Sequence, residues 1–249
     1  MEAQQTMLNT ISNNLANSNT TGFKRAKVEF QDMLYQSQRD AGSETGSGNS
    51  LPAGIEVGNG TQVVSTARVF TQGTVKPTGE QFDIALDGNG FLEVQLPDGS
   101  TGYTRDGGLK VGSDGTILTS NGDPLLSNFQ AVPDGAESVS ISADGNVTIR
   151  TNEGLTTFQI RVARFTNPSG LRSVGSNIYR ETEASGQAET GLPGQNGFGR
   201  ILQGHLETSN VNVVEEMVNM ITTQRAYEIN SKAIQTSDQM LSTIAQLKR

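Results

Sequence analysis

Residues able to carry out catalytic or metal chemistry are few in this sequence, and they stand apart from one another. The chain has one histidine, His205, and no cysteine. Zinc sites and Ser-His-Asp triads need several such side chains in one place, so we interpret His205 as a structural or solvent-exposed residue. Without cysteine, the chain has no disulfide, no thiolate metal site and no cysteine nucleophile.

The other candidate motifs also favour structural interpretations. The segment Asp87-Gly88-Asn89-Gly90 is similar to the start of a calcium-binding loop, but Gly99 stands near the place where such a loop needs a bidentate glutamate. We expect a hairpin turn there. No glycine cluster opens a helix in the phosphate-binding pattern, and we expect Glu215 and Glu216 to be solvated on a helix flank. The sequence therefore predicts no catalytic, cofactor-binding or metal-binding residue, and no enzyme.

Composition narrows the class of protein further. The net charge is −8 and the basic residues are scattered, which argues against nucleic-acid binding. Only 33% of the residues are hydrophobic, which favours several thin layers, partly covered by neighbouring molecules, over one large core. A secreted carbohydrate-binding module is an alternative of another class, but the chain has no tryptophan for a binding platform. We find neither a membrane-spanning run nor a cleaved secretion signal.

The elements that would position these residues are of two kinds, which together predict an α+β fold. Both ends of the chain are predicted to be helical, and a turn-rich, all-β region lies between them. Asp-Gly or Asn-Gly pairs begin at positions 87, 89, 98, 106, 114, 121, 134 and 144, and such pairs supply two residues of positive φ to tight hairpin turns. The segment from Thr157 to Phe165 alternates clearly and predicts a single strand.

The C-terminal helix carries an apolar residue at every seventh position. These residues are Leu206, Val213, Met220, Tyr227, Ile234 and Leu241. A coiled coil buries two positions of each seven-residue repeat, and the second of these is apolar at Met217 but polar in the repeats that follow. A two-stranded coiled coil would therefore be weak, and packing among many helices suits the pattern better. Packing within a helical hairpin of the same chain remains an alternative.

A shorter matching stripe runs along the N-terminal helix, through Met1, Leu8, Ile11 and Leu15. Each stripe must bury its face against the other end of the chain or against another copy. A segment that follows, Arg25 to Tyr35, is compatible with either helix or strand.

Residues 37–60 form a linker or an extended arm by composition, because they include few side chains that can be buried. If this segment is ordered in an assembly, neighbouring subunits must cover Leu51, Ile55 and Val57 and satisfy the backbone hydrogen-bonding groups.

Several motifs together resemble the bacterial flagellar rod and hook family. They cover nearly the whole chain in the family's order: Ile11 to Asn17, Thr20 to Arg25, Asp87 to Phe91, Tyr103 to Gly107, Leu206 to Met217 and Thr223 to Glu228. Within that family, the length and the Gly/Ser-rich segment after Tyr35 most resemble the distal rod branch; the alternative is a proximal rod or hook-type axial subunit. Family members usually carry further residues before the position of Met1.

The resemblance implies a division of the chain into four parts. Residues 1–35 and 201–249 would be helical segments of a coiled-coil-like inner tube, residues 36–68 an extended arm, and residues 69–200 an outer β domain. The implied function is that of a structural subunit that polymerises helically into a rigid hollow drive shaft transmitting torque from motor to hook.

The resemblance also implies partners and a location. The partners would be other copies of the chain, other rod and hook subunits, the bushing rings of the peptidoglycan and outer membrane, and the flagellar type III export apparatus. The location would be the periplasm-spanning rod of the basal body, reached without a cleaved signal peptide.

Overall fold

The computed structural model describes residues 1–39, 53–133, 135–152 and 154–247, and the chain folds into two compact units. The first unit consists of residues 1–13, 26–67 and 214–249, and the second of residues 14–25 and 68–213. Each unit is assembled from segments that are far apart in the sequence.

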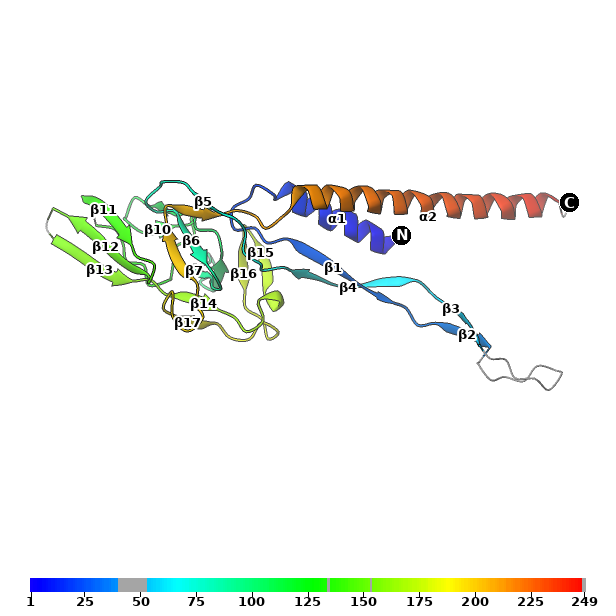
Figure 1. Ribbon diagram of the computed structural model, residues 1–249, viewed down its shortest axis with the longest axis horizontal. Helices are drawn as coiled ribbons and strands as arrows, with labels where there is room; N and C mark the ends of the chain where they lie inside the picture. The colour runs from blue at the N-terminus through cyan, green and yellow to red at the C-terminus, as the bar shows by residue number, and fades with distance from the viewer. Residues whose placement is uncertain (40–52, 134, 153, 248–249) are drawn as a thin grey trace. The chain divides into compact units, whose positions relative to one another are not determined.

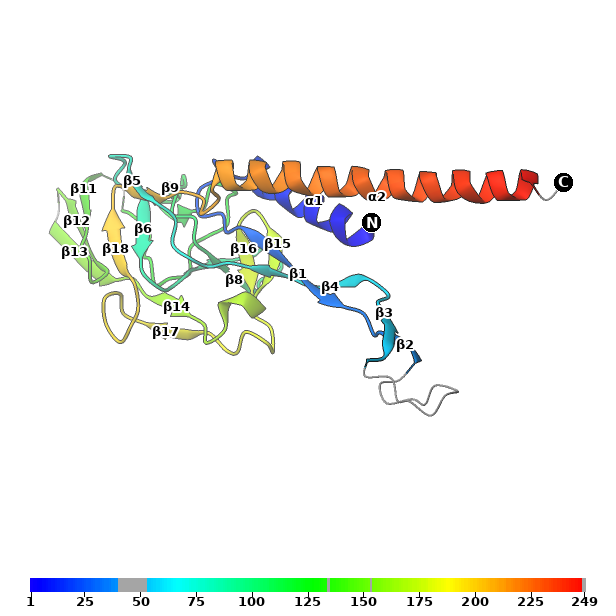
Figure 2. The same cartoon turned by 45° about the vertical axis from the view of Figure 1, so that its right-hand side comes forward.

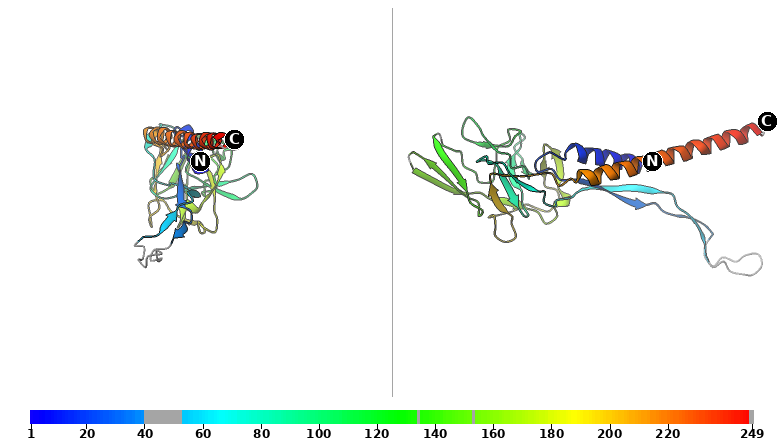
Figure 3. Two further views of the ribbon diagram at one scale, coloured as in Figure 1. Left: turned by 90° about the vertical axis from the view of Figure 1, so that its right-hand side faces the viewer. Right: turned by 45° about the horizontal axis from the view of Figure 1, so that its top comes forward.

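Two helices belong largely to the first unit. Helix α1 spans Glu2–Ala16 and helix α2 spans Val213–Leu247. With 35 residues, α2 is about 52 Å long. Helix α1 lies beside the N-terminal half of α2 and runs in the opposite direction (Figures 1 and 3), and the side chain of Asn230 donates a hydrogen bond of 3.0 Å to that of Gln4.

The sequence explains where each helix begins and ends. Glu215 and Glu216 lie in the first turn of α2, where carboxylates offset the partial positive charge of the helix N-terminus. After α1, a series of turn hydrogen bonds leads to Gly22, which adopts φ +67°. Glycine adopts that conformation at little cost, which suits the turns that follow the helix.

The first unit also contains a long two-stranded ribbon, seen in blue and cyan in Figure 2. Strand β1 (Ala26–Asp32) pairs with β4 (Thr61–Arg68), and β2 (Gln36–Arg39) pairs antiparallel with β3 (Ile55–Val57). The question left open for residues 25–35 is therefore answered by a strand. The ribbon begins with β1 at Ala26, ten residues before the predicted start of the arm at residue 36.

The second unit is a set of small antiparallel sheets. The largest has the strand order β15-β16-β8-β7, and β11-β12-β13 form a three-stranded meander. The pairs β18-β6, β19-β5, β14-β17 and β10-β9 complete the unit. In chain order the strands and the one short helix are β5 (Val75–Pro77), β6 (Ile84–Asp87), β7 (Leu92–Gln95), β8 (Thr101–Thr104), β9 (Lys110–Val111), β10 (Ile117–Leu118), β11 (Ala136–Ile141), β12 (Asn146–Thr151), β13 (Gly154–Gln159), β14 (Val162–Arg164), η1 (Pro168–Gly170), β15 (Arg172–Gly175), β16 (Ile178–Arg180), β17 (Glu189–Gly191), β18 (Arg200–Gln203) and β19 (His205–Glu207).

Two hydrophobic clusters hold these sheets together. The larger cluster is mostly aliphatic and includes Val94, Val147, Ile149 and Ile160, each with no exposed surface. The smaller cluster is aromatic: the rings of Tyr103 and Phe165 meet edge to face at 4.7 Å, with Phe91 and Tyr179 beside them. Edge-to-face pairs of this kind stabilise a core beyond their buried area. The unit thus has several thin layers, in agreement with the low apolar content.

The Gly-rich turns differ in type from the prediction. At the pairs beginning at 98, 114, 121 and 144, the glycine has φ of +77° to +90°, whereas the preceding Asp or Asn is not in the positive-φ region. In each turn the glycine N–H donates to the carbonyl three residues earlier, the pattern of a type I turn followed by a glycine bulge. Two consecutive positive-φ residues are therefore not used there. The pair beginning at 134 includes a residue outside those described.

The strand predicted from Thr157 to Phe165 is interrupted. Strand β13 ends at Gln159 and β14 begins at Val162. Between them, the N–H of Ile160 donates to the carbonyl of Gly145, and that of Arg161 to the carbonyl of Ser127. The chain thus changes sheets within the segment, which local alternation of residues cannot predict.

Candidate functional site

The apolar stripe of the C-terminal segment is only partly buried. Met220 and Tyr227 are half-buried, while Ile234 and Leu241 are 52% and 65% exposed. Val213 and Met217 are also exposed.

Leu206 is not in the helix at all: it lies on β19, because the segment from residue 201 to residue 207 forms the strands β18 and β19. The predicted helical segment 201–249 therefore begins twelve residues too early, since α2 starts at Val213.

Polar side chains occupy buried positions of α2 that the sequence pattern did not identify. Glu216 is 4% exposed and Thr223 is 6% exposed, and the Thr223 hydroxyl donates a 2.7 Å hydrogen bond to the Asn219 carbonyl. The expectation of a solvated pair at Glu215 and Glu216 is thus wrong for Glu216. On α1 the predicted stripe agrees better, because Ile11 is buried and Leu8 and Leu15 are half-buried.

Much of α2 presents apolar side chains to solvent. The residues exposed by 50% or more are Val214, Met217, Val218, Ile221, Ile229, Ile234, Met240, Leu241 and Ile244. Burying one such side chain fully contributes about 1.5–3 kcal/mol. A helix with apolar residues around much of its circumference is typical of one that other helices surround.

The ribbon presents a second apolar surface. Ile55 and Val57, two of the predicted arm contacts, are 50% and 41% exposed, and Leu51 lies outside the described residues. Leu34 and Tyr35 are 89% and 57% exposed, and the arm prediction had not included them. An isolated two-stranded ribbon is marginally stable in water, so contact with further strands or helices would increase its stability.

A buried charge cluster in the second unit joins three of the sequence motifs. The Glu207 carboxylate accepts a 2.5 Å hydrogen bond from the Lys24 ammonium, and the Arg105 guanidinium lies 3.4 Å from its other oxygen. The Lys24 and Glu207 side chains are fully buried. The backbone N–H of Gly73 also donates to Glu207, at 2.8 Å. The three charged residues come from positions 24, 105 and 207, so only the tertiary structure brings them together.

Backbone contacts fix the same junction. The Gly22 N–H donates to the Glu207 carbonyl at 2.8 Å, and the Arg25 N–H donates to the Asn210 side chain at 2.7 Å. The Asn210 amide in turn donates to the Val69 carbonyl. A Cβ on Gly22 would lie 2.7 Å from the Asp106 nitrogen, so this position requires glycine for space as well as for its φ. These contacts anchor the segment 14–25 in the β unit.

Burial sets the electrostatics of the cluster. It lowers the pKa of Lys24, against the opposing attraction of Glu207, and it lowers the pKa of Arg105 for the same reason. Burial also raises the pKa of the nearby Asp106, whose carboxylate accepts a hydrogen bond from Thr21. The cluster shares one carboxylate between two cations, which makes Glu207 the residue on which it depends.

The residues considered above for metal or catalytic chemistry make hydrogen bonds within the protein. His205 is half-buried on β19, and its Nδ1 lies 2.7 Å from the Gln203 carbonyl oxygen. In the loop from Asp87 to Gly90, the Gly88 N–H donates to Gln72 and the Asn89 carbonyl accepts from Gly199. Among the described residues, no group of three His, Cys, Asp or Glu side chains could hold a metal ion. Neither α1 nor α2, as described, is both long and apolar enough to cross a membrane.

Three family models match this chain. The model for the C-terminal part of flagellar basal-body rod FlgEFG proteins matches residues 202–247, that for the D1 domain of the flagellar hook proteins FlgE/F/G matches residues 85–149, and that for flagella basal-body rod proteins matches residues 1–24. Each match includes one residue of the buried charge cluster: Glu207, Arg105 and Lys24, respectively.

Relatives match along the whole chain. The flagellar basal-body rod protein FlgG of Borreliella burgdorferi is 47% identical over 253 residues, covering 100% of this chain and 96% of the relative. The protein of that name from Buchnera aphidicola subsp. Acyrthosiphon pisum is 46% identical, and that from Caulobacter vibrioides is 44% identical. Coverage is 99% and 100% of this chain, respectively, and 96% of each relative.

Proposed function

This chain belongs to the flagellar basal-body rod family, and from that membership we propose that it is a structural subunit of the distal rod, polymerising helically into a rigid hollow drive shaft. In this proposal the shaft transmits torque from the motor to the hook. The observation that carries the proposal is the match to FlgG proteins over nearly the full length of both chains.

The exposed apolar surface of α2 supports assembly through the helices. Ile234, Met240, Leu241 and Ile244 are all more than half exposed, which is unfavourable for an isolated molecule. In the proposed polymer, the α1 and α2 helices of many copies cover one another and form the inner tube. The seam residues Leu8, Ile11, Leu15, Met220 and Tyr227 contribute to that tube, together with the exposed residues of α2.

The ribbon of β1 to β4 is proposed to tie neighbouring copies together. Its exposed side chains, including Leu34, Tyr35, Ile55 and Val57, would pack on adjacent subunits, and Leu51 would extend that contact. The β unit would form the outer shell. Other rod and hook subunits would continue the axis, and rings in the peptidoglycan and outer membrane would surround it.

Export by the flagellar type III apparatus, without a cleaved signal peptide, completes the proposal and places the polymer in the periplasm-spanning part of the basal body. A proximal rod or hook-type subunit is the second candidate within the same family. The two candidates differ in where along the axis the chain is found.

The test uses cells that lack their own distal rod subunit and produce this chain with a small tag. Electron microscopy of isolated basal bodies should find the tag between the proximal rod and the hook. A tag confined to the proximal rod or to the hook would contradict the distal assignment.

A matched pair of variants tests the helix interface. Ile234→Asp places a charge in the proposed packed tube, where an unpaired charge is strongly unfavourable, so rods and motility should be lost. Gln235→Asp adds the same charge at a neighbouring exposed position of α2 and should be tolerated better. Normal rods with Ile234→Asp would show that this position is not in the tube.

A further inference from the structure

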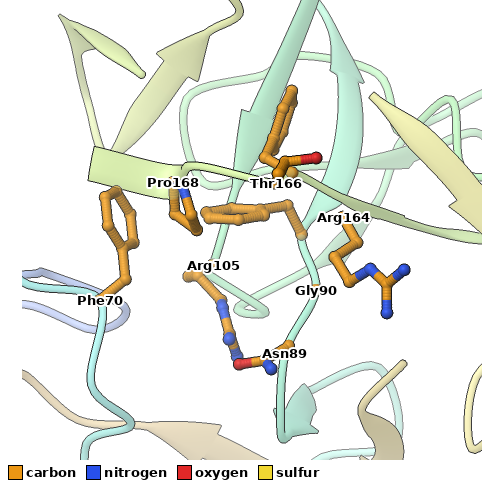
Figure 4. A pocket seen from close by; sticks show the side chains of 9 residues that line it. Phe70, Asn89, Gly90, Arg105, Arg164, Thr166 and Pro168 are labelled. Atoms are coloured by element: carbon orange, nitrogen blue, oxygen red, sulfur yellow. The ribbon is translucent and has the colours of Figure 1, made fainter. Parts of the chain in front are cut away.

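A pocket of about 180 Å³ opens beside the buried charge cluster, wholly within the second unit. Phe70, Phe91 and Phe165 form aromatic walls, and Arg105 supplies a cationic group, while the guanidinium of the other lining arginine, Arg164, points away from the rings (Figure 4). Asn89 lies at the same pocket and is exposed. The pocket therefore combines apolar walls with positive charge, and it is accessible from solvent.

One nitrogen of the Arg105 guanidinium makes no hydrogen bond within the protein. Its Nη1 donates to the Leu86 carbonyl and approaches Glu207, and its Nη2 donates to the Gly88 carbonyl at 2.6 Å. The Nε atom is buried and has no hydrogen-bond partner in the protein, although the side chain is only 3% exposed. A buried donor without a partner is unfavourable, so a ligand that accepts this hydrogen bond would be stabilised.

The charge balance around Arg105 favours an anion as that ligand. Among the described residues, Glu207 is the carboxylate paired with both Lys24 and Arg105, which leaves one positive charge uncompensated. Arg164 does not add to this excess, because its guanidinium is paired with Glu189 and lies over the Phe198 ring. Guanidinium groups bind carboxylates in charge-assisted hydrogen bonds.

We propose that this pocket binds the carboxylate of an aspartate or glutamate side chain from a second copy of the chain. The aromatic walls suit the methylene groups of such a side chain, and the Arg105 Nε–H suits its carboxylate. The assignment of this side chain to a second copy rests on the proposed function, because a polymer places many copies of the chain next to one another. The chain is acidic, with 26 acidic and 18 basic residues.

The first experiment uses the soluble chain and does not depend on polymerisation. The ¹⁵N-labelled chain is titrated with butyrate, which has the end group of a glutamate side chain, and with butyramide, which has that of glutamine. We expect butyrate to shift the Arg105 Nε–H resonance saturably, with a dissociation constant on the order of 1–10 mM. Butyramide should leave it unchanged. Equal responses to the two probes, or no response to either, would overturn the carboxylate site.

Two isosteric variants show whether the bound probe is in this pocket. Asn89→Asp adds a negative charge at the pocket, while Asn121→Asp adds the same charge at another exposed turn outside it, also before a glycine. We expect Asn89→Asp to weaken butyrate binding about tenfold and Asn121→Asp to change it less than about twofold. Equal weakening by both variants would indicate general charge repulsion and would overturn the site.

The second experiment tests the source of the carboxylate. Polymers are formed from a mixture of copies with ¹⁵N-labelled arginine and copies with ¹³C-labelled aspartate and glutamate. A solid-state NMR correlation between Arg105 Nε and a carboxyl carbon would support a side chain from a second copy. A polymer without this correlation would overturn that source. If no polymer forms, both the proposed function and the assignment of the carboxylate to a second copy are contradicted. The butyrate titration still tests the carboxylate site in that case.

Discussion

Glu207 is the residue on which the junction of the second unit depends. Its carboxylate is paired with Lys24 and Arg105, and its carbonyl accepts the N–H of Gly22. Removing one partner of a buried ion pair is costly because the remaining charges stay buried without compensation. Losing the Glu207 carboxylate would therefore weaken the contacts that attach residues 14–25 to the rest of the β unit.

Replacing this carboxylate by an amide of the same shape should therefore lower stability strongly. We expect Glu207→Gln to reduce the free energy of unfolding by about 3 kcal/mol, measured by urea denaturation of the soluble chain. Glu189→Gln is the control, because Glu189 forms an exposed pair with Arg164 and such pairs contribute less than about 1 kcal/mol. Similar effects of the two substitutions would contradict the role given to Glu207.

Tyr103 makes the stability of the β unit sensitive to alkaline pH. Burial, together with the nearby carboxylates of Glu181 and Glu93, raises the pKa of its hydroxyl to about 12. Because the folded state holds this proton more tightly than the unfolded state, whose pKa is about 10, stability should fall as pH rises from about 10 to 12.

The phenylalanine variant isolates this contribution. We expect the difference in unfolding free energy between the unmodified chain and Tyr103→Phe to change by about 1 kcal/mol between pH 9.5 and 11.5, with the unmodified chain losing more. The measurement is urea denaturation at both pH values. Parallel losses in the two proteins would show that another group causes the alkaline instability.

At the scale of elements, the ribbon and α2 share one property: each exposes more apolar surface than its own contacts cover. The ribbon is two strands wide, and among the described pairings its four strands pair only with one another. Helix α2 exposes apolar residues along its length. Elements of this kind are stabilised mainly by tertiary or intermolecular packing. This is why we assign assembly to them.

Deleting residues 36–60 should separate the roles of the ribbon and the helices. The deletion removes the strands β2 and β3 but retains α1 and α2, so we expect polymers to form through the helices and to bend more easily. Bending is measured as persistence length in electron micrographs of isolated rods. Rods of unchanged stiffness would show that the ribbon is a passive linker.

At the scale of the molecule, the β unit needs both ends of its sequence. Residues 14–25 belong to it together with residues 68–213, and Glu207 joins the two parts late in the chain. A chain that emerges N-terminus first therefore lacks this junction until most of it has emerged, which agrees with the proposed export through the flagellar type III apparatus.

Two truncations test this dependence. A chain ending at Val213 keeps the whole second unit and should unfold cooperatively in urea, although it should not polymerise. A chain ending at Gly204 lacks β19 and Glu207 and should lose several kcal/mol of stability, because a buried network is broken. Equal stability of the two truncations would contradict the requirement for the late segment.

The class of fold and the positions of many turns could be predicted from the residues alone. Helices at both ends follow from amphipathic periodicity, and the turns after Asp98, Asp114 and Asp144 follow from glycines that readily adopt positive φ. Asp and Gly at a turn leave its type open, however, because the flanking strands decide whether one or two positive-φ residues are needed. The family was also predicted from motifs, and the relatives confirm it.

Which distant residues contact one another could not be predicted from local patterns. A seven-residue repeat continued back to Leu206, but strand pairing with β5 placed that residue in a sheet. Likewise, Lys24, Arg105 and Glu207 stand 81 and 102 positions apart in sequence, so no local pattern links them, and their union depends on long-range packing that excludes water. Local periodicity predicts which face of a segment is buried. It does not predict which distant segment covers that face, because that contact depends on the free energy of the whole fold.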